Sequence, residues 1–206
     1  MGKSTSPLEN LRNYLPDDSF ELVLPYIIDH KVHLTITRAR TTILGNYIGK
    51  YKDRNHRISI NGNLNKFSFL ITLLHEIAHL LAFEKFGTRI KAHGTEWKKE
   101  YGHVLASFVI KKIFPPDIEE ELRRTLKNPA ASSCAEKELL RILKRYDIGK
   151  GHLLLLEQLK EDDLFKIKSG RVFQKGNKVR TRFLCKEVAT KKMFLFSPVS
   201  EVVLVD

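Results

Sequence analysis

The chain has 206 residues, 42% of them hydrophobic and 29% charged, a balance that supports a sizeable core and is that of a soluble globular protein rather than a disordered one. The net charge of +12 favours polyanionic partners such as nucleic acid, with a merely basic soluble surface as the alternative. The two cysteines, Cys134 and Cys185, lie far apart and outside any C-x-x-C motif, so we expect neither a disulfide framework nor a four-cysteine zinc site.

The N-terminal segment is expected to be helical from residue 8 to about residue 30. A polar run, residues 16–19, precedes a second helix that begins near Phe20. Pro25 lies in or near the first turn of this helix, or kinks it. We expect these helices to cover the core.

The next segment changes to a period of two. Val32, Leu34 and Ile36 alternate with polar residues, as in a half-buried strand. Further strands are expected near residues 42–51 and 56–61, joined by a turn-rich stretch. The sequence therefore predicts a small antiparallel sheet that leads into a long helix.

That helix contains an almost continuous apolar segment, residues 67–86, whose centre is interrupted by His75, Glu76 and His79. Three titratable side chains are costly to bury there without a partner, and a metal ion suits two histidines best. Helix positions i and i+4 lie about 40° apart around the axis, so His75 and His79 can share one ion. Glu76 lies about 100° from His75 and can reach a water on that ion. This is the H-E-x-x-H arrangement, in which two imidazoles hold Zn²⁺ and the glutamate acts as general base.

Residues 67–86 are also long enough for a membrane span. Intramembrane proteases that carry H-E-x-x-H in such a helix need several neighbouring spans, and this sequence offers none. Residues 1–18 lack the apolar core of a signal peptide. We therefore expect a cytoplasmic protein without a membrane partner.

The ends of the central helix are marked in the sequence. Asn65 is a suitable N-cap and Gly87 a suitable residue to end the helix. A second helix is expected over about residues 95–114, before two prolines. The metzincin extension is absent, because Ala82 and Lys85 occupy the positions where glycine and histidine would be required.

A catalytic zinc normally has three protein ligands and one open position for water. His93 is the preferred third ligand, since it lies in the loop where the chain passes back over the central helix, and Gly94 would let the backbone approach closely. Glu96 and Glu100 are the alternatives, because one class of H-E-x-x-H enzymes uses a downstream glutamate.

The combination of H-E-x-x-H at residues 75–79, a gap of thirteen residues and H-G-x-x-W at residues 93–97 resembles the SprT-like (Spartan-related) family of zinc metalloproteases. The resemblance covers roughly residues 8–116. It implies an α+β fold with a zincin-like core, in which His75, His79 and His93 bind zinc and Glu76 is the catalytic acid and base. It also implies that Trp97 packs beneath the site.

The same resemblance implies a zinc-dependent endopeptidase with protein substrates. Eukaryotic members of the family cleave proteins crosslinked to DNA, and their activity depends on DNA, so this kinship and the basic charge suggest DNA-bound or DNA-crosslinked substrates. In zinc proteases, a small sheet like the one expected before the central helix commonly offers an edge strand, to which an extended substrate adds as a further strand. A second donor to the developing oxyanion is not identified by the sequence; Tyr47, Tyr51 and Tyr101 are candidates.

We expect three segments: a metalloprotease core over residues 1–116, a helical linker over residues 117–150 and a small basic β domain over residues 151–206. Two capping-box patterns, at residues 117–120 and 133–136, open the helices of the linker. Cys134, at the start of the second, is expected to be a small packing residue rather than a reactive thiol.

Short strands and turns dominate the last segment. Many relatives carry a zinc ribbon here, which Cys134 and Cys185 cannot build, so Cys185 is expected to be a buried strand residue rather than a remaining ligand. A turn is expected at residues 175–178. The expected strands cover residues 153–158, 164–168, 171–174, 179–186, 193–196 and 202–205.

Positive charge concentrates in this last segment, with ten basic residues against one acidic residue over positions 166–192. Lys178, Arg180 and Arg182 alternate, which on one strand places them on one face, with Phe173 and Phe183 nearby. Such a patch favours contacts with DNA phosphates that do not depend on base sequence, and a solvated strand face is the alternative.

A rival function is a DNA-binding protein whose zinc site is structural or inactive. Glu76 argues against it, because a structural site needs no general base.

Overall fold

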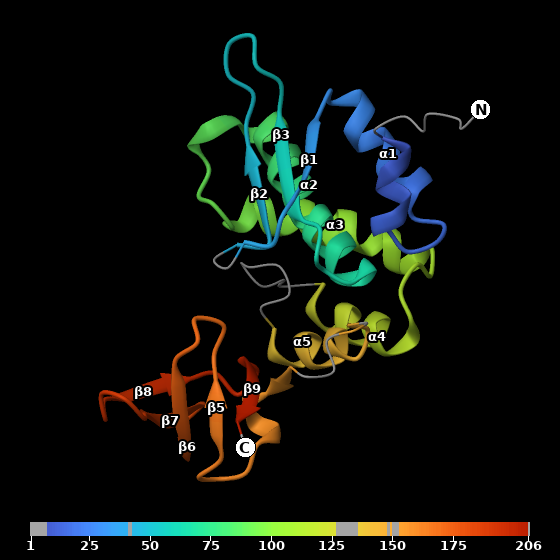
Figure 1. Cartoon of the computed structure of the whole chain (residues 1–206). Helices are drawn as coiled ribbons and strands as arrows, with labels where there is room; N and C mark the ends of the chain where they lie inside the picture. Colours follow the sequence, from blue (N-terminus) through green and yellow to red (C-terminus); the bar gives the residue numbers. More distant parts are fainter. Residues whose placement is uncertain (1–7, 41–42, 127–135, 148, 150–152, 206) are drawn as a thin grey trace, which may run out of the picture. The chain divides into compact units, whose positions relative to one another are not determined.

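The computed structural model describes residues 8–40, 43–126, 136–147, 149 and 153–205. They divide into two compact units, Met1–Tyr146 and Asp147–Asp206. Both helices and sheets are present, so the chain is an α+β protein, as predicted (Figure 1).

The first unit begins with a 3-10 helix, η1 (Glu9–Tyr14), and a helix, α1 (Phe20–Asp29), that accommodates Pro25. Pro25 is the sixth residue of α1, beyond the first turn, so its missing N–H leaves the carbonyl oxygen of Glu21 without the usual helical hydrogen bond. Leu11, Val23 and Ile27 turn inward from these two elements and are buried. They therefore cover the core, as expected.

Three strands follow, β1 (His33–Thr37), β2 (Gly45–Ile48) and β3 (Arg57–Asn61), in the order β1-β3-β2. β2 and β3 are antiparallel, but β1 and β3 run parallel, so the predicted antiparallel sheet is wrong for this pair. β3 carries the fully buried Ile58 and Ile60 and takes the centre. The chain after β1 therefore crosses to the far side of β3, which leaves β2 as an edge strand.

The central helix, α2 (Lys66–Phe86), lies behind this sheet in Figure 1. The Asn65 side chain accepts a hydrogen bond from the backbone N–H of Ser68, which caps the helix as predicted, and Gly87 ends it with a φ of +73°. In the described part of the chain, the span from Lys66 to Arg89 is the one helical stretch long and apolar enough to cross a membrane. The protein buries 72% of its most apolar window, as in the core helix of a soluble protein.

The described part of the first unit also contains a 3-10 helix, η2 (Gly87–Arg89), and the helices α3 (Thr95–Ile110), α4 (Pro116–Thr125) and α5 (Lys137–Lys144). Ile118 and Leu122 of α4 and Leu139 and Leu143 of α5 join the same buried core as α2. The segment expected to be a linker thus supplies core residues to the first unit. The expected cap over residues 133–135, including Cys134, falls outside the described residues.

The second unit is a six-stranded antiparallel sheet in the order β4-β9-β5-β6-β7-β8. Its core contains Phe165, Phe173 and the fully buried Cys185. In this unit Cys185 packs as a strand residue, as expected, and burial raises the pKa of its thiol. The strands are β4 (Leu154–Leu155), β5 (Leu164–Lys166), β6 (Val172–Val179), β7 (Arg182–Glu187), β8 (Met193–Phe196) and β9 (Glu201–Val205).

The turn predicted at residues 175–178 is wrong, because these residues belong to β6. The register against β7 shifts between Lys175 and Lys178, which marks a bulge. At Gly176 the two strands approach so closely that a Cβ would lie 2.4 Å from the carbonyl oxygen of Leu184. Gly176 and the polar residues around it therefore form a bulge within β6. The turn between β6 and β7 lies at Arg180 and Thr181.

Candidate metal centre

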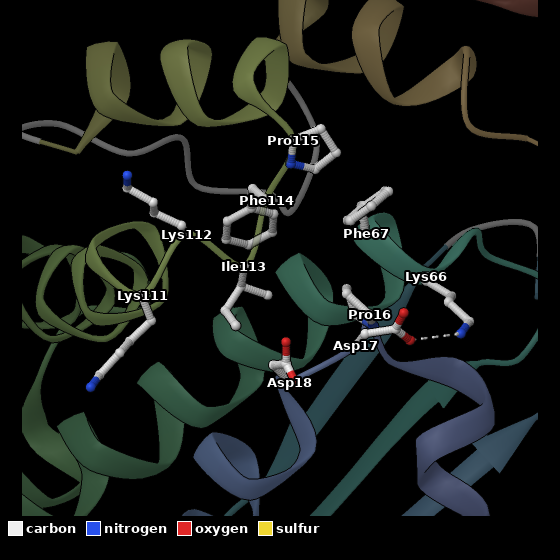
Figure 2. Close-up of a pocket in the computed structure, with 10 residues that line it drawn as sticks. All are labelled: Pro16, Asp17, Asp18, Lys66, Phe67, Lys111, Lys112, Ile113, Phe114 and Pro115. Atoms are coloured by element: carbon white, nitrogen blue, oxygen red, sulfur yellow. Dashed lines mark ion pairs between the residues drawn. The ribbon is translucent and has the colours of Figure 1, made fainter.

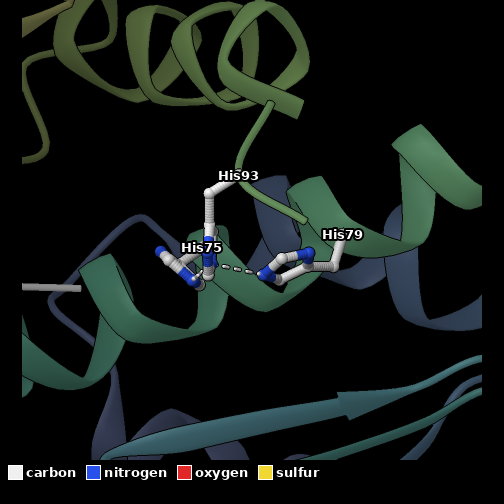
Figure 3. Close-up of side chains that lie close together, drawn as sticks. All are labelled: His75, His79 and His93. Carbon is white, nitrogen blue, oxygen red and sulfur yellow. Dashed lines mark hydrogen bonds between the residues drawn. The ribbon is translucent and has the colours of Figure 1, made fainter. Parts of the chain in front are cut away.

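Three histidines meet at the middle of α2. His75 and His79 project from consecutive turns of the helix, and His93 reaches them from the loop before α3 (Figure 3). The backbone of His93 has a φ of +57°, in the left-handed region that non-glycine residues seldom occupy. This strained turn aims the imidazole back at α2.

The Nε2 atoms of the three rings converge. Nε2 of His93 lies 3.2 Å from Nε2 of His75 and 3.0 Å from Nε2 of His79. Tetrahedral ligands at a zinc–nitrogen distance of about 2.0–2.1 Å lie roughly 3.4 Å from one another. The spacing of these nitrogens therefore fits a single metal ion.

The two glutamates considered as rival third ligands lie outside this group. The only set of candidate metal ligands among the described residues consists of the three histidines. Glu100 is mostly buried, and its Oε1 forms an ion pair with Nζ of Lys85 at 2.8 Å. The structure thus brings His93, and neither Glu96 nor Glu100, to the pair on α2.

All three imidazoles are held in the neutral form that can donate a lone pair to a metal. Burial, together with His79 and His93, lowers the pKa of His75 to about 3. Burial and His93 lower the pKa of His79 to about 4, and burial lowers that of His93. Nδ1 of His75 is buried and has no hydrogen-bond partner in the described part of the chain, which adds to the cost of burying this ring.

Trp97 packs against the triad from α3. Its side chain is fully buried, and its ring centroid lies 4.6 Å from that of His75, 5.2 Å from His79 and 4.7 Å from His93. Tyr101 stacks on Trp97 at 5.0 Å. The ligand rings therefore rest against an aromatic layer, as the resemblance implied for Trp97.

Glu76 lies beside the triad on the same helix and is only 5% exposed. Burial raises the pKa of its carboxyl group to about 7, although the positive charge of Arg40 opposes this shift. A carboxylate with a pKa near 7 can both accept and release a proton at neutral pH. A metal cation nearby would lower this pKa and favour the base form.

Gly45, at the start of β2, is a site residue that the sequence reasoning missed. A Cβ at this position would lie 2.5 Å from Oε1 of Glu76 and 2.7 Å from Cγ2 of Thr72. The absence of a side chain at residue 45 therefore leaves room for the carboxylate against the edge strand. The only available signal was a glycine at a strand end, which usually marks a turn or a close approach.

The segment before β2 is held by Arg40, which was also missed. Its guanidinium donates to Oδ1 of Asn61 at 2.8 Å and to Oγ of Ser59 at 3.0 Å. Asn61, only 1% exposed, donates in turn to the carbonyl oxygens of Arg40 and Ile43. This network ties Arg40 and Ile43 to β3.

Comparison with known proteins agrees with this geometry. Residues 26–117, which contain the three-stranded sheet, α2 and α3, match the model of the SprT-like family. This segment is a SprT-like domain. The resemblance inferred from H-E-x-x-H and H-G-x-x-W is thereby confirmed, and the family suggests a metalloprotease type. No curated protein and no solved structure matches the chain.

The three candidate oxyanion donors occupy different places in the SprT-like domain. Tyr51 is 69% exposed, and Tyr101 is buried behind Trp97. Tyr47 lies on β2 with its ring parallel to that of His79, the centroids 6.2 Å apart and the planes within 6°. Only Tyr47 therefore lies between the edge strand and a ligand.

The basic residues of the second unit do not share one strand face, contrary to the prediction. Lys178 is in β6 and Arg182 in β7, while Arg180 lies in the turn with a φ of +55°. All three are exposed at the tip of the β6–β7 hairpin. The strand face was inferred from alternation along one strand, but the chain reverses within that run.

A hollow of about 430 Å³ lies elsewhere in the first unit (Figure 2). Its rim mixes acidic and basic side chains, and Asp17 forms an ion pair with Lys66 at 3.8 Å. Its lining contains none of the three histidines and no Glu76. We therefore place the candidate active site of the SprT-like domain at the triad, not in this hollow. The lining residues are Pro16, Asp17, Asp18, Lys66, Phe67, Lys111, Lys112, Ile113, Phe114 and Pro115.

Proposed function

We propose that the chain is a zinc-dependent endopeptidase of the SprT-like type with a zincin-like core. The observation that carries this proposal is the convergence of three neutral imidazoles beside the buried carboxylate of Glu76. Three protein ligands are the number that catalytic zinc sites use, since the fourth position is kept for water or substrate.

In this proposal His75, His79 and His93 hold the ion. A bound zinc would supply Lewis acidity, which makes water a stronger nucleophile and polarises the scissile carbonyl. Glu76 accepts the proton of the attacking water and then passes it to the nitrogen of the leaving amine. The aromatic layer at Trp97 keeps the ligand rings in place and water away from their buried side.

The edge strand supports an extended protein substrate. β2 has one neighbour, β3, and its other edge is unpaired within the described sheet. A peptide that pairs with β2 would pass Gly45, which lies against the Glu76 carboxylate. Strand pairing would thereby hold an extended chain with one of its peptide bonds near the general base.

We further propose that the exposed β6–β7 hairpin binds DNA phosphates and that the substrates are DNA-bound or DNA-crosslinked proteins. Two other basic residues of this unit are already engaged. Arg171 pairs with Glu187, and the buried Lys175 donates to the carbonyl oxygen of Leu159. The hairpin side chains Lys178, Arg180 and Arg182 remain exposed. We expect the protein to act in the cytoplasm and without a membrane partner.

A cleavage assay with the purified chain tests the proposed activity. Zinc-loaded protein should cleave casein, and it should cleave histone faster when DNA is present than when DNA is absent. A chelator such as phenanthroline should stop cleavage, and added Zn²⁺ should restore it. Zinc bound at one ion per chain with no cleavage of either substrate would instead favour the DNA-binding protein with a structural or inactive site.

Neutralising the hairpin tests the DNA contact. Changing Lys178, Arg180 and Arg182 to glutamine should weaken DNA affinity and reduce the slope of log affinity against log salt by up to about 2.7, because each phosphate contact contributes roughly 0.9. The measurement is a DNA titration at several salt concentrations.

The matched control removes the same charge from exposed lysines elsewhere in the unit, by changing Lys160, Lys166 and Lys168 to glutamine. This control should change the salt slope much less than the hairpin variant. Equal slopes for the hairpin variant and the wild type would remove the hairpin from the DNA interface.

A further inference from the structure

A chain of hydrogen bonds begins at Tyr47, directly beside the ligand His79. The hydroxyl of Tyr47 lies 2.8 Å from Nδ1 of His56, and Nε2 of His56 lies 3.0 Å from Oε1 of Glu84. Nζ of Lys50 pairs with the same carboxylate oxygen at 2.7 Å. The chain links β2, the residue before β3 and the last turn of α2.

The direction of these hydrogen bonds follows from one backbone contact. The N–H of Lys50 donates to Nδ1 of His56 at 3.3 Å, so Nδ1 is an acceptor and the proton of the ring is on Nε2. Nε2–H therefore donates to Glu84, and the Tyr47 hydroxyl donates to Nδ1. Burial lowers the pKa of His56, which keeps the ring neutral, and burial raises the pKa of Tyr47 above its usual range, which keeps the hydroxyl protonated.

Because the hydroxyl of Tyr47 donates its hydrogen bond to His56, Tyr47 is not the second donor to the oxyanion. The aromatic ring of Tyr47 lies parallel to the imidazole of the metal ligand His79. Phe83 of α2 packs edge-on against Tyr47 at 6.3 Å and against His56 at 5.5 Å, which fills the space behind these two rings. The tyrosine is thus fixed at its hydroxyl end and along its ring.

The two ligands on α2 are supported in different ways. His75 is 4% exposed and contacts Trp97 and Tyr101 of α3, with centroids 4.6 and 5.5 Å away. His79 is only partly buried. Its ring neighbours outside the triad are Trp97 of α3 and Tyr47 of β2. The orientation of His79 therefore depends on the sheet as well as on α3.

We propose that Tyr47 is a positioning residue for the metal ligand His79, anchored by His56 and Glu84. The proposal rests on the proposed function only in that His79 binds a metal ion. In this proposal the hydrogen bonds from Tyr47 through His56 to Glu84 keep the edge strand at a fixed place relative to His79. Residues that orient ligands typically change metal affinity about 10–100-fold when they are removed.

The test is metal binding by the full-length chain. Tyr47→Leu should weaken Zn²⁺ binding in a chelator competition by roughly 10-fold, and should change the visible absorption of the Co²⁺-substituted protein, because the His79 ring loses its stacking partner. Tyr51→Leu is the matched control, since Tyr51 belongs to the same hairpin region but is 69% exposed. The control should bind both metals as the wild type does.

A second pair of variants tests the anchor without removing the ring. Tyr47→Phe and His56→Leu should each weaken Zn²⁺ binding by a smaller and similar factor. The double variant should lose no more than either single variant, because both break the same hydrogen bond. This cycle still gives an answer if Tyr47→Leu does not fold, which circular dichroism of the metal-free chain would reveal.

The outcomes separate this proposal from the proposed function. A wild type that binds zinc, together with a folded Tyr47→Leu or Tyr47→Phe whose zinc affinity and cobalt spectrum are unchanged, would overturn the positioning role and leave the protease proposal intact. A wild type that binds neither metal would overturn both. Independent, additive effects of Tyr47→Phe and His56→Leu would contradict the anchor.

Discussion

Glu76→Gln is expected to abolish peptide cleavage and to leave zinc binding unchanged. Glutamine has nearly the same shape as glutamate but cannot accept the proton of the attacking water, and general-base catalysis contributes roughly 10²–10⁴-fold. The side chain is 5% exposed and lies beside the triad without belonging to it, so the ligand set stays complete. The measurements are the cleavage rate on a DNA-bound histone and the zinc content of the same preparation.

The fold should tolerate this change, because burial already disfavours the charged form of Glu76, as its pKa of about 7 shows. A neutral amide removes that cost, so the melting temperature of the variant should not fall below that of the wild type. Loss of both zinc and activity would mean that residue 76 supports the ligands. Normal cleavage by the zinc-loaded variant would falsify the proposed mechanism.

A substitution in β2 can also displace the carboxylate of Glu76. Gly45→Ala would place a Cβ 2.5 Å from Oε1 of Glu76 and should lower kcat while zinc binding is retained. Gly49→Ala is the matched comparison, since its Cβ would meet the Phe83 ring at 2.8 Å instead of the carboxylate. If both variants lose the same activity, general disturbance of the edge strand explains the loss, and not displacement of Glu76.

The parts of the site that lie within one helix were predictable from the sequence. His75, Glu76 and His79 share a helix whose geometry fixes their spacing, and the start at Asn65 and the end at Gly87 follow from local capping chemistry. The spacing of H-G-x-x-W further along the chain was enough to indicate the family, which the match over residues 26–117 confirms. Helix capping rules and the spacing of the motif were thus sufficient to predict the bounds of α2 and the family of the domain.

The contacts between elements were not predictable in the same way. Gly45 meets Glu76, and Tyr47 meets His79, only because β2 lies at the sheet edge nearest to α2. The parallel pairing of β1 and β3 arises because β3, with Ile58 and Ile60, occupies the centre. No periodicity along one strand specifies which neighbour it takes.

Backbone conformation also limited the prediction. The close backbone approach expected at Gly94 is present, since a Cβ there would lie 2.9 Å from the carbonyl oxygen of Lys91. The positive φ of the neighbouring His93, however, was not predicted. In the second unit, Arg180 has a positive φ where alternation suggested an extended strand. Both conformations are imposed by the neighbouring elements and leave no mark in the residue type.

His93→Ala is expected to remove tight zinc binding, and with it peptide cleavage. Structural zinc sites are held by about 10–16 kcal/mol, which among four ligands is roughly 3 kcal/mol each. The loss of one ligand should therefore weaken binding about 100-fold, since each 1.4 kcal/mol is a factor of ten. Chelator competition with the full-length chain measures the change directly.

The positive φ of His93 calls for a second variant, because a change in the loop could alter zinc binding without any loss of a ligand. Asparagine tolerates the left-handed conformation better than alanine does, so His93→Asn keeps the turn and removes the imidazole. Equal loss of zinc in His93→Asn and His93→Ala would assign the effect to the missing ring. Glu96→Gln and Glu100→Gln complete the comparison: both should keep zinc, since neither carboxylate belongs to the triad. Unchanged tight binding in His93→Asn, together with zinc loss in one of the glutamine variants, would move the third ligand to that glutamate.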